Sequence, residues 1–488
     1  MRRAEPAPSG GGSLLEQLDA ARVGVVLLLL LPVFAIFRQG LVDPDFWWHL
    51  EAGRWIVEHG RVPWEDPFSY TARGHLWIAY SWLPEVVFYA LTHFVGFNAL
   101  IYFTAGAAAA LLGLIYLSCR AAGASPSASL AVSSLAGAAA SGAWAERPQL
   151  ISFVLLAALV GCLRSERLAV RLPWLTALLV ALWANVHIVF SVGIALVGLA
   201  ATCDLVEGRR DLRRWAAVAL GALATLLNPY GWQLLEHLPL MVGQLGVIRV
   251  TGELQSPDFH SVLGKVIGVF VLGSIAVLVI SRERKTLFEL ASFLIALGSG
   301  LYMARNMALF AIIAAPTLAH HLDSLLPSRD FRSPRRVPRR LLALNYFLVS
   351  SAIVALLLLA PKQRGWRENL APGLFPVAAA DLVADRYPGR RLFNDFDSGG
   401  FLIFRLYPGT LVSIDGRNQV YGEEIMRRYL QTYFVSRGWE QFLRDCDPEV
   451  ILWPSDSPFA ILVGKLPEWR QVFADETAVV FVKVGRAS

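Results

Sequence analysis

The feature that most constrains this chain is a succession of long apolar runs between residues 22 and 360. A membrane-spanning helix needs about 20 mostly apolar residues, and about eleven runs approach that length. They cover residues 22–38, 97–118, 125–143, 148–163, 172–186, 188–205, 214–228, 264–281, 286–301, 306–321 and 341–360. Hydrophobic residues make up 55% of the sequence and charged residues 17%, a balance that is not typical of a soluble globular protein. The sequence therefore predicts a polytopic α-helical membrane protein.

The basic residues predict how the chain is oriented in the membrane. Every second loop is rich in arginine: RSERLAVR from Arg164, EGRRDLRR from Glu207, SRERK from Ser281 and PSRDFRSPRRVPRR from Pro327. Cytoplasmic loops carry such an excess, so we expect a cytoplasmic amino terminus in a plasma (inner) membrane. The loops 39–96 and 229–263, the turns near 144–147, 185–187 and 302–306, and everything after residue 360 then face the periplasm or the exterior. This placement explains the net charge of +6 without a nucleic-acid partner.

The chain divides into three parts. Residues 1–21, with EPAPSGGGS, predict a flexible cytoplasmic leader, and the first apolar run predicts a retained signal anchor. Residues 22–360 form the transmembrane domain, in which the segment 81–95 is expected to be a helix along the interface. Residues 365–488 predict a soluble α/β domain. RRLFNDF, TLVSIDG, EVILWP and TAVVFVKV are typical of strands, and EEIMRRYLQTYFV, WEQFLRDC and FAILVGKL are typical of helices.

The stretch DPDFWWHLEAG, which starts at Asp43, concentrates polar groups just after the first apolar run. A carboxylate at Asp43 or Asp45 can bind a divalent cation, accept a proton from an acceptor group, or cap a helix. His49 and Arg54 follow on the same expected helix. The two tryptophans of WWH suit an aromatic belt at the membrane surface. From these residues alone, catalysis and helix capping both stay open.

Further polar residues fall in the other outer segments. The tight turn WAERPQ carries Glu146 and Arg147, which could be a plain surface pair or part of a site. His187 lies in WANVHIVF, and Arg305 lies in YMARNMALF, where an arginine is costly unless it meets a phosphate or carboxylate. In the soluble domain, one expected strand ends in Asn394 to Gly400, a segment that contains Asp397, and the next strand ends in Asp415, Gly416 and Arg417. Such strand ends can bind ligands, whereas Asp-Gly and Gly-Gly between strands can also be ordinary turns.

At these residues the chain resembles the GT-C glycosyltransferases, polytopic enzymes that take sugars from polyprenyl-phosphate carriers on the outer side of the membrane. In that superfamily a catalytic Asp lies in the first outer loop and an interfacial helix follows, as DPDFWWH and SWLPEVVFYALTHF do here. A second acidic position often lies between the third and fourth spans, where this chain has Glu146. The soluble domain resembles more loosely that of the oligosaccharyltransferase catalytic subunit, but NDFDSGG lacks the tryptophans of its WWDYG motif.

The resemblance implies transfer of a hexosyl or pentosyl group from a polyprenyl-phosphate donor to an acceptor on the periplasmic face. It implies a base or metal ligand at Asp45 or Asp43, helped by Glu146, with Mg²⁺ or Mn²⁺ as the ion if one is used. The residues expected to bind substrate are His49, Arg54, Arg147, His187, Arg305, Asp397, Asp415 and Arg417. The competing hypotheses are a transporter or flippase for a lipid-linked or anionic substrate, and a non-catalytic envelope assembly protein.

Overall fold

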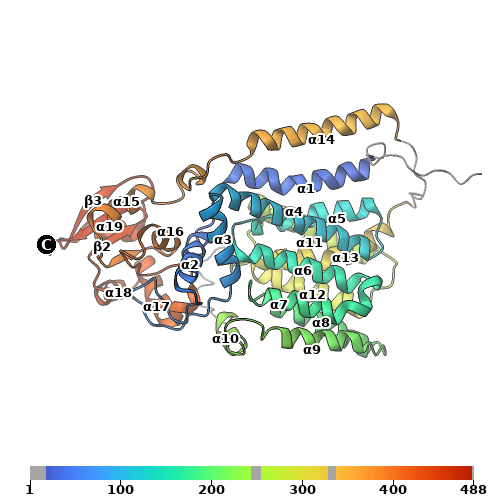
Figure 1. Cartoon of the computed structure of the whole chain (residues 1–488), viewed down its shortest axis with the longest axis horizontal. Helices are drawn as coiled ribbons and strands as arrows, with labels where there is room; N and C mark the ends of the chain where they lie inside the picture. The colour runs from blue at the N-terminus through green and yellow to red at the C-terminus, as the bar shows by residue number, and fades with distance from the viewer. Residues whose placement is uncertain (1–17, 243–253, 328–336, 486–488) are drawn as a thin grey trace, which may run out of the picture.

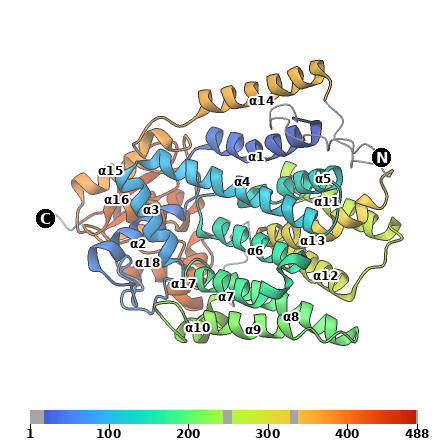
Figure 2. The ribbon, with the colours of Figure 1, turned by 45° about the vertical axis from the view of Figure 1, so that its right-hand side comes forward.

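The computed structural model describes residues 18–242, 254–327 and 337–485. A helical bundle carries a smaller α/β domain, which we call the soluble domain, at one end, and the helices α2 (Phe46–His59) and α3 (Trp82–Phe94) lie between the two parts in Figure 1. In Figure 2, which is turned by 45°, the two helices overlap the soluble domain. Most of the expected leader, residues 1–17, lies outside the described residues, as do residues 243–253 and 328–336 of two predicted loops.

A helix lies over each of the predicted apolar runs. The bundle contains α1 (Ala20–Gln39), α4 (Phe97–Ala121), α5 (Pro126–Ala139), α6 (Pro148–Arg164), α7 (Leu172–Trp183), α8 (Phe190–Val206), α9 (Leu212–Ala224), α10 (Gln233–Val242), α11 (Val262–Ile280), α12 (Leu287–Tyr302), α13 (Met307–Asp323) and α14 (Arg339–Leu359). The helix α14 lies along the edge of the bundle beside α1 (Figure 1). Most of its leucines are exposed, as expected for a helix that faces lipid.

Several of the described helices are long and apolar enough to span a membrane. By length and composition, α1, α4, α11 and α14 are the four described helices that could each cross a membrane. The count rises to five if α6 and the segment Glu166–Trp183, which are bent by 107°, form one broken span. The described residues thus support an integral membrane protein with several apolar helices, and the figure of about eleven spans stays a prediction.

The connecting loops are sorted to the two ends of the bundle. Two predicted outer turns meet the soluble domain, because Arg147 and His187 line one cavity together with Asp397. Two segments that were predicted to lie on the inner side contact each other elsewhere, because Arg164 at the end of α6 lies 3.3 Å from Glu289 at the start of α12. These turns and segments therefore lie at different ends of the bundle, whereas the alternation of all the loops and the assignment of one end to the periplasm stay predictions.

The helix α3 covers the segment that was expected to lie along the interface. It has 13 residues, and at 1.5 Å per residue it is about 20 Å long, which is short of the roughly 30 Å hydrocarbon core. It packs against α2 rather than within the bundle. This length agrees with a helix on the outer surface.

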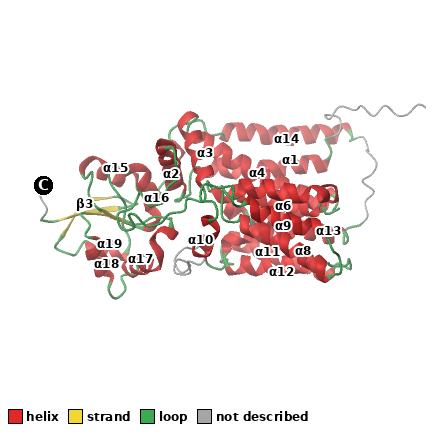
Figure 3. Cartoon of the chain, turned by 60° about the horizontal axis from the view of Figure 1, so that its bottom comes forward, coloured by secondary structure: helices red, strands yellow, loops and turns green. Residues whose placement is uncertain are grey.

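The soluble domain has a small mixed sheet, and Figure 3 shows strands only in this part of the described chain. Its elements are α15 (Val377–Arg386), β1 (Leu392–Asn394), α16 (Phe396–Leu406), α17 (Asn418–Tyr433), α18 (Trp439–Cys446), β2 (Val450–Trp453), α19 (Pro458–Val463), β3 (Trp469–Ala474) and β4 (Val479–Lys483). The strand order is β1-β2-β4-β3. The strands β1 and β2 are parallel, with Leu392 opposite Val450, and the other two pairs are antiparallel.

Two local predictions for this domain are wrong. The segment TLVSIDG is not a strand of the sheet, because Val412 makes only isolated bridges to Leu392 and Ser69. The expected turn at the two glycines of NDFDSGG is part of α16. Asp395 caps this helix by accepting the backbone N–H of Ser398 at 2.9 Å, and the helix buries its apolar face in the domain core.

The soluble domain is fastened to the first outer loop by a buried guanidinium. Arg417 lies 2.7 Å from Asp66 of the loop and 2.7 Å from Asp415 of its own domain. The rings of Phe68 and Trp77 lie 4.9 Å and 4.6 Å from the guanidinium carbon. The three charged side chains have no exposed surface, so Arg417 links the two parts through charge and packing together.

Replacing this guanidinium should loosen the two domains. Arg417→Ala leaves two carboxylates buried without their cation, which costs about 3–5 kcal/mol. We expect a lower apparent melting temperature in detergent and faster proteolysis at the domain boundary. Arg427→Ala is the control, because its pair with Glu424 is exposed and worth about 0–1 kcal/mol. Equal melting of the two variants would contradict the proposed fastening.

Candidate active site

Asp43 holds the start of α2 in place. Its Oδ1 accepts the backbone N–H groups of Asp45 at 2.8 Å and of Phe46 at 3.3 Å, which is the bonding of a helix cap. Its Oδ2 pairs with Nε of Arg147. With 4% of its side chain exposed, Asp43 acts chiefly as a support for the helix and for this arginine.

Unlike Asp43, Asp45 has a partly exposed carboxylate. Its Oδ1 accepts the indole N–H of Trp48 at 3.2 Å, and its Oδ2 lies 3.3 Å from Nη2 of Arg147. Its side chain is 27% exposed and lines a cavity. The backbone of Gly416 lies against it so closely that a Cβ there would be 1.8 Å from Oδ1. The soluble domain therefore forms one wall around this carboxylate.

The two tryptophans of the first loop are buried instead of anchoring it in a lipid belt. Trp47 has no exposed surface and packs among aromatic rings of the soluble domain, with Phe404 at 4.9 Å and Phe401 at 5.4 Å between centroids. Trp48 is 6% exposed. The belt prediction is wrong because the soluble domain covers this face of α2.

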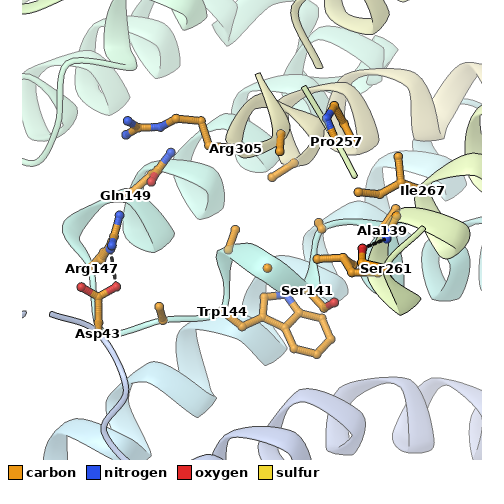
Figure 4. Close-up of a pocket in the computed structure, with 18 of the residues that line it drawn as sticks. Asp43, Ala139, Ser141, Trp144, Arg147, Gln149, Pro257, Ser261, Ile267 and Arg305 are labelled. Atoms are coloured by element: carbon orange, nitrogen blue, oxygen red, sulfur yellow. Dashed lines mark hydrogen bonds and ion pairs between the residues drawn. The ribbon is translucent and has the colours of Figure 1, made fainter. Parts of the chain in front are cut away.

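Two cavities meet beside these residues. The first, which we call the interdomain cavity, has a volume of about 550 Å³, and its walls come from α2, the outer turns of the bundle and the soluble domain. The second, which we call the helix cavity, has a volume of about 470 Å³ and lies among α5, α11 and α13 (Figure 4). Both are of a size that holds small-molecule ligands. The two share Pro44, Arg147, Gln149 and Arg305.

The helix cavity differs from the interdomain cavity in its lining. Much of its surface comes from alanines of the outer end of α5 and from Trp144, Leu263 and Ile267, whereas Asp43, Arg147 and Arg305 stand at the end where the cavities join (Figure 4). The interdomain cavity is lined largely by hydrogen-bonding side chains. The helix cavity also has polar groups from Gln39, Ser141, Asp258 and Ser261, so the two cavities differ in degree, and both are lined by the guanidinium-bearing residues Arg147 and Arg305.

The structure separates the predicted site residues into three groups. Asp45, His49, Arg147, His187, Arg305 and Asp397 all line the interdomain cavity, and Asp43 lines the helix cavity. Arg54 lines neither of these and pairs with Glu51 at 2.6 Å beside a smaller pocket. Asp415 and Arg417 form the buried fastening between the domains. The buried positions of Asp415 and Arg417 thus do not support their predicted role in substrate binding.

Glu146 lies behind the site rather than in it. It lines neither cavity and is 2% exposed. The backbone N–H groups of Val42 and Asp43 donate to its carboxyl group, whereas its Oε2 has no hydrogen-bond partner. Burial, followed by the charge of Asp43, raises the pKa of Glu146 to about 7. Glu146 therefore supports the first outer loop through its hydrogen bonds with the backbone of Val42 and Asp43.

Several residues of the site were not expected. Tyr80 and Ser81 precede α3, Asn418 and Gln419 begin α17, and all four line the interdomain cavity. Nothing in the local sequence distinguishes them from other polar residues near helix ends. They reach the cavity only because α3 and the soluble domain pack against the bundle.

The imidazoles of the cavity are held neutral. Burial lowers the pKa of His187 to about 3, and the neighbouring Arg305 and Arg147 lower it as well. Burial, with Arg147 next in importance, also lowers the pKa of His49 well below 6.5. The positive charge in this region therefore rests on the guanidinium groups.

The three carboxylates that were predicted to bind a metal ion do not fit one as they are arranged. Asp43 and Asp45 both direct an oxygen to the guanidinium of Arg147, and Glu146 is held by backbone N–H groups. A divalent cation needs several oxygen ligands that converge on one point. Within the part of the chain that the structure describes, no cluster of three such side chains suits a metal ion.

Comparison with known proteins identifies the fold. No family model and no curated protein matches this chain. The oligosaccharyltransferase of Archaeoglobus fulgidus in the apo form is similar over 88% of this chain and 69% of its own, with a TM-score of 0.54 and 10% identity. ArnT from Cupriavidus metallidurans, bound to undecaprenyl phosphate, is similar over 95% of this chain and 98% of its own, with a TM-score of 0.52 and 14% identity. The chain has the fold of the GT-C glycosyltransferases.

The predicted resemblance to the GT-C superfamily is thus confirmed at the level of the fold. The similarity extends through the bundle and into the soluble domain, since it covers nearly the whole chain. At these identities it concerns the fold alone, because one fold can serve several functions. The chemistry has to be argued from the side chains of the two cavities.

The buried carboxyl group of Glu146 gives a pH-dependent stability. Its pKa is about 7 in the folded chain against an ordinary value of 4.5, so the folded state binds the proton more tightly. Stability should then fall as the pH rises from about 4.5 to 7, by about 3 kcal/mol in all. We expect Glu146→Gln to melt above the unmodified protein at pH 8, with a smaller difference at pH 5. Glu440→Gln, at an exposed site, is the control; a difference independent of pH would contradict this account.

Proposed function

We propose that this chain is a membrane glycosyltransferase that moves a hexosyl or pentosyl group from a polyprenyl-phosphate donor to an acceptor on the periplasmic face of the inner membrane. The observation that carries the proposal is that Arg147 and Arg305 line both the helix cavity, which has many small apolar residues, and the interdomain cavity, with Asp45 beside Arg147. The similar fold of ArnT, which binds undecaprenyl phosphate in its structure, supports a lipid partner of this class.

The two cavities suggest how the donor lies. The helix cavity takes the first isoprenoid units, because much of its wall consists of alanines and other apolar residues. The phosphate then lies at the junction, where Arg147 and Arg305 meet both cavities. Guanidinium groups bind phosphate oxygens with charge-assisted hydrogen bonds. The sugar extends into the interdomain cavity, where the acceptor enters from the soluble domain.

Asp45 is the better choice for the base. Asp43 uses one oxygen to cap α2 and the other to hold Arg147, whereas Asp45 faces the cavity in which the sugar would lie. In the proposed step the acceptor hydroxyl gives its proton to Asp45 and its oxygen bonds to the anomeric carbon. The bond from that carbon to the phosphate oxygen breaks, and its electron pair stays with the phosphate, whose charge Arg147 and Arg305 stabilise.

The location of the polar groups favours this surface reaction over transport. A transporter usually has its substrate site near the bilayer midplane, at broken helices. Here the interdomain cavity has walls from both the bundle and the soluble domain, so it lies where the two meet. A non-catalytic assembly protein would not need a carboxylate and two guanidinium groups directed to one junction.

The role of Asp45 can be tested by removing its charge. We expect Asp45→Asn to lower sugar transfer at least about 100-fold, because a positioned base contributes 10²–10⁴-fold. Binding of undecaprenyl phosphate should stay within a few-fold. The assay follows radiolabelled hexoses and pentoses from undecaprenyl-phosphate donors into acceptors in isolated membranes. Asp445→Asn, at an exposed position of α18, is the control, and full activity of Asp45→Asn would remove the proposed base.

The role of Arg305 can be tested by lipid binding. Loss of a charge-assisted hydrogen bond costs about 1.5–3 kcal/mol, so Arg305→Ala should raise the Kd for undecaprenyl phosphate roughly 10-fold to 100-fold. Arg444→Ala, on the far side of the soluble domain in an exposed pair, should leave the Kd unchanged. An unchanged Kd in Arg305→Ala would mean that the phosphate binds elsewhere. If the unmodified protein moved the lipid across vesicle membranes without transferring sugar, the flippase hypothesis would be favoured.

A further inference from the structure

A buried acid and a cavity histidine are joined across two helices of the outer surface. Nδ1 of His49 on α2 lies 2.9 Å from Oε1 of Glu85 on α3. The two residues are 6% and 1% exposed. His49 lines the interdomain cavity, whereas Glu85 does not. One side of His49 therefore lines the cavity, and the other side contacts the carboxyl group of Glu85.

The close approach of α2 and α3 makes this contact possible. Gly53 lies one turn after His49, and a Cβ at this glycine would fall 2.0 Å from the carbonyl oxygen of Glu85. Any larger residue would push α3 away and lengthen the bond to the imidazole. The ring of Trp48 lies on His49, with 3.5 Å between centroids, and limits its rotation.

Glu85 has no other role that the described contacts reveal. Its Oε2 is buried without a hydrogen-bond partner, and His49 is its one ion-pair partner among the described residues. A buried carboxyl group with a single partner is costly for the fold. A helix at this position would be more stable with an apolar side chain, which points to a role for the acid through the histidine.

The pKa shifts of Glu85 and His49 indicate which of the two groups carries the shared hydrogen. Burial raises the pKa of Glu85 to about 8 and lowers the pKa of His49 well below 6.5. At neutral pH the carboxyl group therefore keeps its hydrogen and donates it to Nδ1. The ring hydrogen of the neutral imidazole then lies on Nε2, which is the nitrogen left for the cavity.

We propose that Glu85 is a positioning residue that holds His49 through Nδ1, so that Nε2 donates its hydrogen to an oxygen of the sugar-phosphate donor in the interdomain cavity. The inference rests on the proposed transfer and adds to it a hydrogen-bond donor directed at the leaving phosphate. Such donors act most strongly where charge develops in the transition state. The effect should therefore fall on kcat more than on KM.

The test is a double-mutant cycle between the two positions. We expect Glu85→Leu to lower kcat for sugar transfer about 10-fold to 100-fold, with KM changed less than about threefold. Glu85→Gln should retain most activity, because its amide can donate to Nδ1 in the same way. In a His49→Gln background, whose amide nitrogen stands in for Nε2, Glu85→Leu should have less than about a twofold further effect.

The controls separate positioning from folding. His93→Leu changes another titratable side chain of α3 and should leave kcat unchanged. If Glu85→Leu does not fold, Glu85→Asp withdraws the carboxyl group by one methylene and should lower kcat in the same way. Full activity of a folded Glu85→Leu or Glu85→Asp variant would overturn this inference alone. So would an equal loss of kcat from Glu85→Leu in the His49→Gln background and in the unmodified protein. An unmodified protein without any transfer would overturn the proposed function, and this inference with it.

Discussion

The guanidinium of Arg417 is the interaction on which the site depends. It lies between Asp66 of the first outer loop and Asp415 of the soluble domain, without exposed surface. The residue before it, Gly416, lies against Asp45, so the fastening also sets the wall of the interdomain cavity. Without this buried contact the interdomain cavity would lose one of its walls, because five of its lining residues come from the soluble domain: Phe396, Asp397, Gly416, Asn418 and Gln419.

A second guanidinium joins the parts of the site within the bundle. Arg147 pairs with Asp43 and with Asp45, and it belongs to both cavities. Asp43 thereby orients the arginine, and the arginine orients Asp45. A site in which cations and carboxylates hold one another is preorganised for developing charge. The pair of His49 and Glu85 extends the same arrangement toward α3.

Six residues that the sequence singled out one by one line the same cavity: Asp45, His49, Arg147, His187, Arg305 and Asp397. For the first five the signal was polar character next to apolar runs, where a charge needs a purpose, and for Asp397 it was the end of an expected strand. Their role in catalysis or binding stays a prediction. Glu146 carried the same signal, yet it lies behind the loop because its turn places it against the backbone of Asp43. Trp47 was expected in lipid and is covered by the soluble domain, since hydropathy does not distinguish the two environments.

The sequence by itself determined the helical membrane part, the side of the bundle that carries the polar turns, and the presence of a separate soluble domain, because each follows from patterns local to the chain. Only the tertiary structure decided that Asp45 faces the cavity whereas Asp43 caps α2, and that Glu85 meets His49. These choices depend on segments far apart in the sequence that pack on one another, and the direction of a side chain follows from that packing rather than from its neighbours in the chain.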